Sequence, residues 1–234
     1  MKIELFHAPG CPDRQATRRL VKETLQSLGR DDPVEEISLK RPIKSAGSPA
    51  GLPPAIHIDG QDVEPESVRL SGSPPRLYLN GTGLPDPQKL RFRLARAAGL
   101  KTVLFICTGN AVRSQMAEAL VNHFRKSRWA AFSAGFQPAG LHPLVVQVLR
   151  EIGVDPARQE TKHVDLFNGC AFDRIFSLCS EADRMCTYYP AFGNRVHIPF
   201  QDPLSASVFG FGWLGLFRRL RDDMQAILLN RLES

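Results

Sequence analysis

Apolar and polar positions along the chain fall into two successive series of predicted strands and helices. In the first series, short apolar or alternating runs predict strands at residues 2–6, 34–39, 55–59 and 76–80. Apolar stripes at helical spacing predict helices at residues 13–28 and 87–98, the first with an inward stripe of Ala16, Leu20, Val21, Thr24, Leu25 and Leu28. In the second series, strands are predicted at 102–107, 130–135, 173–178 and 195–198, and helices at 113–126, 143–152 and 214–232.

This order predicts two α/β domains, residues 1–98 and residues 99–234. The run Thr102–Cys107 is apolar throughout, as expected of a parallel strand buried on both faces. Alternation of strands and helices in the second domain specifies a doubly wound, parallel, four-stranded sheet, in which ligands bind at the carboxyl ends of the strands. Cys107 ends the first of these strands, so we expect a binding site there.

Composition narrows the function classes. The net charge of +6 over 234 residues is shared about equally by the two halves, with no basic run, so we expect no nucleic-acid partner. We expect no membrane span, because no apolar run approaches the roughly 20 residues that one requires, and no export signal opens the chain. A cytoplasmic protein with five cysteines is expected to use them for redox or nucleophilic chemistry rather than as a disulfide framework. No Cys-x2-Cys or paired histidines indicate a metal site.

The segment "CTGNAVRS", from Cys107 to Ser114, carries the main chemical signal. Five residues between a cysteine and an arginine can fold into a loop whose backbone N–H groups converge on one anion at the start of a helix. The same donors stabilise a thiolate, which makes Cys107 a candidate nucleophile. The alternative is an ordinary strand-to-helix turn. The predicted oxyanion-binding residues are Thr108, Gly109, Asn110, Ala111, Val112, Arg113 and Ser114.

The second domain resembles the low-molecular-weight protein tyrosine phosphatase superfamily. Its segment "VLFICTGNAVRSQMAEAL" is most similar to the thioredoxin-coupled arsenate reductase branch, because Gln115 follows the arginine-serine pair where phosphatases usually have proline or threonine. The resemblance implies that Cys107 is the nucleophile and Arg113 binds the oxyanion, while Asn110 and Ser114 hold the loop. It also implies that Asp202, in "QDPL", is the general acid.

Two further cysteines distinguish a reductase from a phosphatase. Cys179 and Cys186 lie seven positions apart on a predicted helix, and the reductases carry two cysteines at this spacing. Seven helical residues rise about 10 Å, beyond the roughly 7 Å limit for a disulfide, so the helix must unwind for the two to bond. The resemblance implies a relay in which Cys179 attacks the Cys107–arsenic adduct and releases arsenite. Cys186 then attacks Cys179, and an external thioredoxin or small thiol reduces the resulting disulfide.

Other interpretations stay open at this point. The chain could be a phosphatase of phosphate monoesters with protective cysteines, or the two cysteines could simply be buried on one helix face. Leu204 and Ser205 follow Asp202 where phosphotyrosine phosphatases usually have aromatics, which favours the reductase. Ala111 and Val112 replace the serine and cysteine that many family members have in the loop.

No bound cofactor is expected, and the potassium site of some family members is incomplete in this sequence. Some reductases bind a potassium ion through four side chains, of which Asn110, Glu118 and Ser133 are matched here, but the place of the fourth, an aspartate, falls at Lys162 or His163. Cys170 lies outside every motif and is expected to be structural. The apolar residues Phe209, Phe211 and Trp213 are expected to form a covering flap or to contact the first domain or another subunit, unless they pack in the core.

The first domain resembles the thioredoxin and glutaredoxin superfamily. Cys11 in "APGCPDR" falls between the first strand and the first helix, and Pro54 precedes the third strand, where the superfamily has a usually cis proline. A dithiol member would have its second cysteine at Arg14, so Cys11 is a single thiol and a possible redox relay. The helix start and Arg14 favour its thiolate, whereas the alternative is an inert cysteine. The fused domain could instead bind a partner thiol protein without catalysis.

Overall fold

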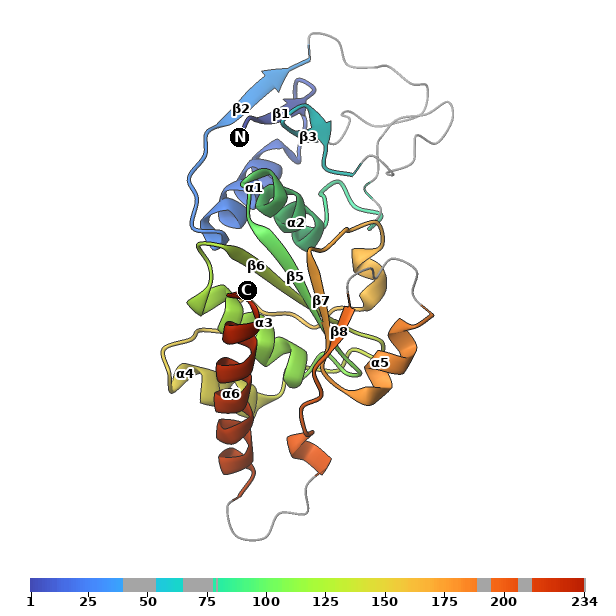
Figure 1. The fold of residues 1–234 in the computed structure, drawn as a ribbon. Helices are drawn as coiled ribbons and strands as arrows, with labels where there is room; N and C mark the ends of the chain where they lie inside the picture. The colour runs from blue at the N-terminus through green and yellow to red at the C-terminus, as the bar shows by residue number, and fades with distance from the viewer. Residues whose placement is uncertain (40–53, 65–77, 79, 189–194, 206–211, 234) are drawn as a thin grey trace. The chain divides into compact units, whose positions relative to one another are not determined.

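The computed structural model describes residues 1–39, 54–64, 78, 80–188, 195–205 and 212–233 (Figure 1). These residues divide into two compact units, Met1–Gly99 and Leu100–Ser234. No helix in the described ranges combines the length and the apolar character needed to cross a membrane.

The N-terminal unit contains one mixed sheet and two helices. Its elements are β1 (Ile3–His7), α1 (Arg14–Ser27), β2 (Val34–Ser38), β3 (Ala55–Ile58), β4 (Gln61–Asp62) and α2 (Pro87–Ala97). The strand order is β2-β1-β3-β4, with β1 parallel to β2 and antiparallel to β3. This mixed α/β arrangement is consistent with the thioredoxin-like fold that we predicted.

Two details of this unit differ from the expectation. Ala16 is exposed, and Thr17 is buried in the stripe of α1, where its hydroxyl donates to the Asp13 carbonyl at 2.8 Å. The short strand β4 was not predicted; it pairs with β3 through Asp59 and Gly60, both of which have positive φ as a tight hairpin requires. The strand predicted at residues 76–80 lies mostly outside the described residues.

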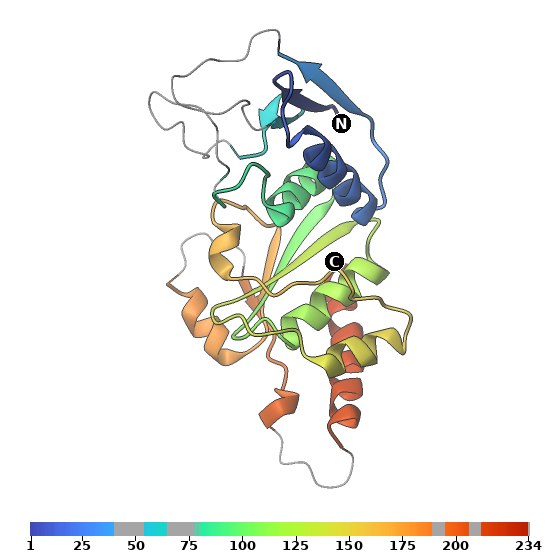
Figure 2. The same ribbon diagram turned by 180° about the vertical axis from the view of Figure 1, so that it is seen from behind.

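The C-terminal unit is built on a sheet whose strands are all parallel, as predicted. Its elements are β5 (Lys101–Cys107), α3 (Arg113–Phe124), β6 (Trp129–Gly135), α4 (Pro143–Arg150), η1 (Val164–Phe167), β7 (Arg174–Ser177), α5 (Ser180–Cys186), β8 (Arg195–His197), η2 (Pro203–Ser205) and α6 (Gly212–Arg231). The helices α3, α4 and α6 pack against one another, whereas α5 lies away from them beside β7 (Figures 1 and 2). The expected contact of segment 209–213 lies outside the described residues except for Gly212 and Trp213 in the first turn of α6.

The topology selects one place for a ligand. The strand order is β6-β5-β7-β8, so the chain leaves β5 toward β6 and later returns to the opposite side of β5 to form β7. The connections therefore diverge between β5 and β7, and in doubly wound sheets ligands bind at the carboxyl ends of the two strands where this happens. Cys107 ends β5, and Cys179 follows β7 by two residues. Two of the predicted site cysteines are thus placed at the same edge of the sheet by topology alone.

Candidate active site

The loop between β5 and α3 is anchored by its carbonyl groups. Backbone N–H groups of the following segment donate to three of them: Gln137 to Thr108 at 2.9 Å, Ala139 to Gly109 at 2.8 Å and His142 to Ala111 at 3.1 Å. Within the described chain, no backbone N–H of residues 108–112 donates to another protein group. Because the loop carbonyls are bonded to the following segment, the loop N–H groups remain available to bind an anion at the start of α3. The helix dipole adds positive potential there.

Asn110 holds the loop in a conformation that most residues avoid. Its φ is +45°, in the left-handed region, and its side chain is fully buried. The amide nitrogen donates to the hydroxyls of Ser114 at 2.8 Å and Ser133 at 2.9 Å, and the amide oxygen accepts from Gln115 at 3.1 Å and from the Lys162 backbone at 2.7 Å. Every hydrogen-bonding capacity of this buried amide is used, which fixes both the loop and the hydroxyl of Ser114.

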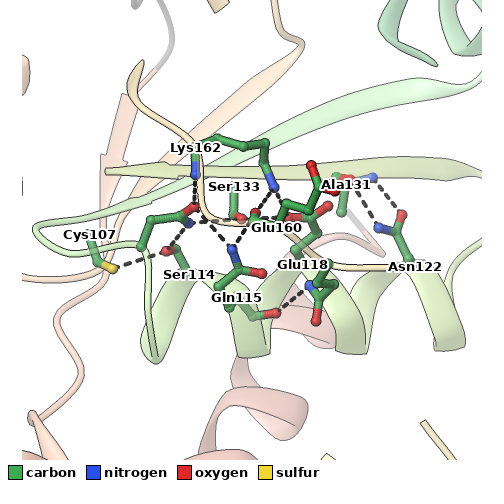
Figure 3. A network of polar contacts seen from close by, with 11 residues as sticks. Cys107, Ser114, Gln115, Glu118, Asn122, Ala131, Ser133, Glu160 and Lys162 are labelled. Atoms are coloured by element: carbon green, nitrogen blue, oxygen red, sulfur yellow. Dashed lines mark hydrogen bonds and ion pairs between the residues drawn. The ribbon is translucent and has the colours of Figure 1, made fainter. Parts of the chain in front are cut away.

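Ser114 connects this network to the thiol. Its oxygen lies 3.0 Å from the Cys107 sulfur and accepts from Asn110, so its hydrogen is available to donate to the sulfur (Figure 3). Cys107 is 2% exposed. A hydroxyl donor and the open loop N–H groups around one sulfur are the surroundings that stabilise a thiolate.

Gly135, at the end of β6, is required by the close approach of this loop. A Cβ added there would lie 2.7 Å from the Asn110 nitrogen and 2.7 Å from the Thr108 carbonyl oxygen, both backbone atoms that cannot turn away. We therefore expect Gly135→Ala to lower the free energy of unfolding by about 1–3 kcal/mol, because the loop must shift to admit the methyl group. Gly140→Ala is the matched control, since a Cβ there meets nothing within 4 Å. Urea unfolding of both variants tests this; equal stabilities would show that the loop adapts.

Arg113 and Asp202 are 89 residues apart in the chain and form an ion pair at the site. The Arg113 Nη2 lies 2.8 Å from Asp202 Oδ2, and its Nη1 donates to the Phe200 carbonyl at 3.4 Å. Asp202 is itself fixed, because its Oδ1 accepts from the Leu204 backbone and its carbonyl accepts from Ser205. An oxyanion in the loop would compete with this carboxylate for the guanidinium and would leave Asp202 beside it.

Cys179 lies against the loop. Its sulfur is 3.4 Å from the Thr108 hydroxyl, which donates to Glu181 at 2.9 Å, so the Cys179 thiol is the donor to Thr108. Cys179 precedes α5 in extended backbone (φ −152°, ψ 153°), and only Cys186 lies in the helix. The prediction that both cysteines lie on one helix is therefore wrong, because Cys179 lies one residue before the helix begins. The contact with Thr108 was not predicted, since pattern reasoning has no means of pairing residues 71 positions apart.

Cys186 is closed off at the other end of α5. It is 1% exposed, and burial, opposed by Arg195 and reinforced by Asp183, raises its pKa to about 11. Asp183, in the middle of α5, accepts from the Ser177 hydroxyl at 2.6 Å and from Arg195 at 3.1 Å. Side chains from β7 and β8 thus tie α5 in place, and no disulfide joins any of Cys107, Cys179 and Cys186.

The shifted pKa of Cys186 predicts its reactivity. A rise from 9.0 to about 11 lowers the thiolate fraction about 100-fold at a given pH below 9, so iodoacetamide modifies Cys186 far more slowly in the folded chain than in urea. Between these two pKa values the folded state keeps a proton that the unfolded state has lost, so stability around α5 is full below pH 9 and falls as the pH rises toward 11. Peptide mass spectrometry after alkylation at pH 8 measures the rates, and urea unfolding between pH 8 and pH 11 measures the stability; equal alkylation rates at pH 8 in buffer and urea would contradict the prediction.

The residues that the resemblance links to potassium do not fit a potassium ion. Glu118 and Ser133 do meet near Asn110, but the Lys162 ammonium lies 3.1 Å from Glu118 Oε2 and already supplies a positive charge there (Figure 3). In the part of the chain that the structure describes, no group of three or more histidine, cysteine, aspartate or glutamate residues is placed to hold a metal.

In the N-terminal unit, Cys11 lies in the turn before α1 and is 9% exposed. Arg14 is not an unpaired charge beside Cys11, because the Arg14 Nε lies 2.5 Å from Glu36 Oε2. This hydrogen bond holds the pKa of the Glu36 carboxyl below its usual value. Pro54 precedes β3 as predicted, and its carbonyl accepts from the Tyr78 hydroxyl at 2.6 Å. The peptide bond before Pro54 involves residue 53, outside the described residues. Cys170 is buried and lies away from these motifs in the sequence.

Comparison with known proteins finds similar sequences for the C-terminal unit. The low molecular weight phosphotyrosine protein phosphatase family matches residues 102–201. An arsenate reductase from Brevibacillus brevis is 40% identical over 126 residues, or 54% of this chain and 90% of that protein. One from Bacillus cereus is 37% identical over 124 residues, or 53% of this chain and 88% of that protein. A solved arsenate reductase in the phosphate binding state is 26% identical, covers 57% of this chain and 98% of its own, and has a TM-score of 0.48.

The chain therefore belongs to the low molecular weight phosphotyrosine protein phosphatase family. Both of these relatives are named arsenate reductases.

Proposed function

We propose that the chain is a thiol-dependent arsenate reductase, in which a disulfide relay follows nucleophilic attack on a tetrahedral oxyanion. The observation that carries this proposal is the contact of the Cys179 sulfur with Thr108, inside the loop that holds Cys107. A hydrolase needs one thiol at the loop, whereas a reductase needs a second one close enough to attack the first. The names of the relatives support the same reaction.

The first step is an exchange of oxygen for sulfur on arsenic. The loop N–H groups and Arg113 bind arsenate, and the Cys107 thiolate attacks arsenic(V). One arsenate oxygen leaves as water, and Asp202, displaced from Arg113 by the bound oxyanion, donates a proton to it. The product is an arsenate group bound through sulfur to Cys107.

The second step is the reduction. The Cys179 sulfur attacks the Cys107 sulfur, so that an S–S bond forms, the S–As bond breaks, and its electron pair stays on arsenic. Arsenic(V) becomes arsenic(III), which leaves as arsenite, and two thiols become a Cys107–Cys179 disulfide. Cys186 then attacks Cys179 and releases Cys107. This last attack requires α5 to open, because Cys186 lies buried at the far end of the helix.

The Cys179–Cys186 disulfide needs an external reductant, a thioredoxin-type protein or a small thiol. We propose that residues 1–98 form a thioredoxin-like domain and residues 99–234 the reductase domain, with Cys11 as a possible relay of electrons between the donor and this disulfide. A relay of reduced thiols works in a reducing compartment, in keeping with a cytoplasmic protein.

A second candidate is hydrolysis of phosphate monoesters. The loop, Arg113 and Asp202 suit phosphate as well as arsenate, because both are tetrahedral oxyanions, and the matching family model is that of phosphatases. We propose it as a residual activity of the same site.

A stoichiometric experiment tests the proposal. The fully reduced chain is mixed with arsenate in the absence of any reductant, and arsenite and free thiols are counted. The reductase mechanism yields one arsenite and loses two thiols per chain, with a Cys179–Cys186 disulfide in the peptide map. Phosphate in place of arsenate should leave all thiols reduced. Hydrolysis of an aryl phosphate without any arsenite would instead establish the phosphatase.

A further inference from the structure

A buried ion pair lies beneath the oxyanion loop. The side chains of Lys162 and Glu118 are only 4% and 7% exposed, and the ammonium also donates to the Glu160 carbonyl at 2.7 Å. Two charges at this depth lose most of their hydration, and a carboxylate left there alone would be strongly destabilising. Lys162 is therefore the partner that offsets the cost of burying the Glu118 carboxylate inside the unit.

The Glu118 carboxylate sets the direction of every hydrogen bond between it and the nucleophile. Ser133 donates to Glu118, so the Ser133 oxygen can accept only from Asn110. Asn110 then donates its second amide hydrogen to Ser114, whose hydrogen is left for the Cys107 sulfur. Figure 3 shows Lys162, Glu118, Ser133 and Ser114 in one connected series that ends at Cys107.

Lys162 acts on Asn110 a second time through its backbone, which donates to the Asn110 amide oxygen at 2.7 Å. The same residue therefore holds both ends of the network: the oxygen of Asn110 directly, and its nitrogen through Glu118 and Ser133.

We propose that the Lys162 ammonium, rather than a bound potassium ion, is the permanent cation of the oxyanion loop, and that it is a positioning residue for Asn110, Ser114 and Cys107. The inference rests on the oxyanion loop of the proposed function, but not on arsenate being its substrate. The chain carries its own cation, so the strength of oxyanion binding is independent of potassium.

The test measures inorganic phosphate binding by the full chain in two salts of equal ionic strength, potassium chloride and tetramethylammonium chloride. Binding is read as the protection of Cys107 from iodoacetamide in the peptide map. The unmodified chain should bind phosphate equally in both salts. In Lys162→Met, which keeps the length of the side chain but removes its charge, phosphate binding should weaken on the order of tenfold in tetramethylammonium chloride. It should recover in potassium or ammonium chloride, because a small cation can take the place of the ammonium between Glu118 and the Glu160 carbonyl.

A double variant, Lys162→Met with Glu118→Gln, is the matched control. With no carboxylate left to attract a cation, its phosphate binding should not respond to potassium. Wild-type affinity of Lys162→Met in tetramethylammonium chloride, or potassium dependence of the unmodified chain, would overturn the proposal. If Lys162→Met does not fold in either salt, Glu118→Gln alone replaces it; weaker phosphate binding that potassium does not restore supports the proposal, and unchanged binding overturns it.

Arsenate turnover is measured on the same samples. A chain that shows the expected phosphate and salt responses but never produces arsenite would refute the proposed function and leave the role of Lys162 standing.

Discussion

Replacing Cys107 with serine lowers arsenate turnover by more than about a thousandfold, the largest effect that we expect from any single substitution. The serine oxygen fits the place of the sulfur, and Asn110 and Ser114 keep their contacts, so the loop should still bind an oxyanion. What is lost is the nucleophile: an alcohol is far less acidic than a thiol, and an oxygen in this place cannot form the disulfide that expels arsenite.

The measurement combines arsenite production with phosphate binding. The phosphate affinity of Cys107→Ser, measured by calorimetry, should lie within a few-fold of that of the unmodified chain, while the variant produces no arsenite. Cys170→Ser, which changes another buried cysteine away from these motifs, serves as the control and should retain turnover. Arsenite production by Cys107→Ser at the wild-type rate would mean that another thiol is the nucleophile.

Replacing Cys186 with serine stops the reaction after one turnover. Cys179 can still attack Cys107, so one arsenite per chain should appear, but Cys107 then remains in a disulfide with Cys179. Steady-state turnover with a thioredoxin-type donor should fall by at least about a hundredfold. Peptide mapping after arsenate treatment should find the Cys107–Cys179 bond, which the unmodified chain passes through only briefly.

Cys179→Ser gives the contrasting result. This variant should release no arsenite at all, since nothing attacks the arsenic adduct, and yet it should hydrolyse an aryl phosphate as fast as the unmodified chain. The difference between one arsenite and none distinguishes the second thiol of the relay from the third. Sustained turnover in both variants would leave the relay without support.

The sequence was most informative where local pattern and chemistry coincide. The apolar run before Cys107 and the amphipathic run after Arg113 predicted β5, the loop and α3 to within a few residues, because a buried parallel strand and a packed helix have strong periodic signatures. The strand β4 escaped notice because two residues are too few to show a period. Ala16 was predicted to be buried where Thr17 is, because a threonine whose hydroxyl donates to its own helix can be buried as easily as an alanine.

The sequence predicted most residues of the site but not the side-chain contacts between them. Cys107 and Arg113 are neighbours in sequence, but the contacts of Cys179 with Thr108 and of Asp202 with Arg113 come from the return of distant strands to the same edge of the sheet. The sequence marked Lys162 only as a place where a potassium ligand is missing. A lysine in a polar segment is normally solvated, and only the fold reveals that Lys162 is buried in an ion pair with Glu118.

The helix α5 is only seven residues long, and a helix of that length has almost no stability of its own in water. Its contacts with the rest of the unit hold it in place, among them those of Asp183 with Ser177 and Arg195 and the burial of Cys186. In the proposed relay, the step from the first disulfide to the second would then depend on the local opening equilibrium of α5 as well as on the reactivity of the thiols. Substitutions on β7 and β8 that never touch arsenic would then tune the speed of the whole cycle, and the reductant would meet only those molecules in which this equilibrium has already shifted.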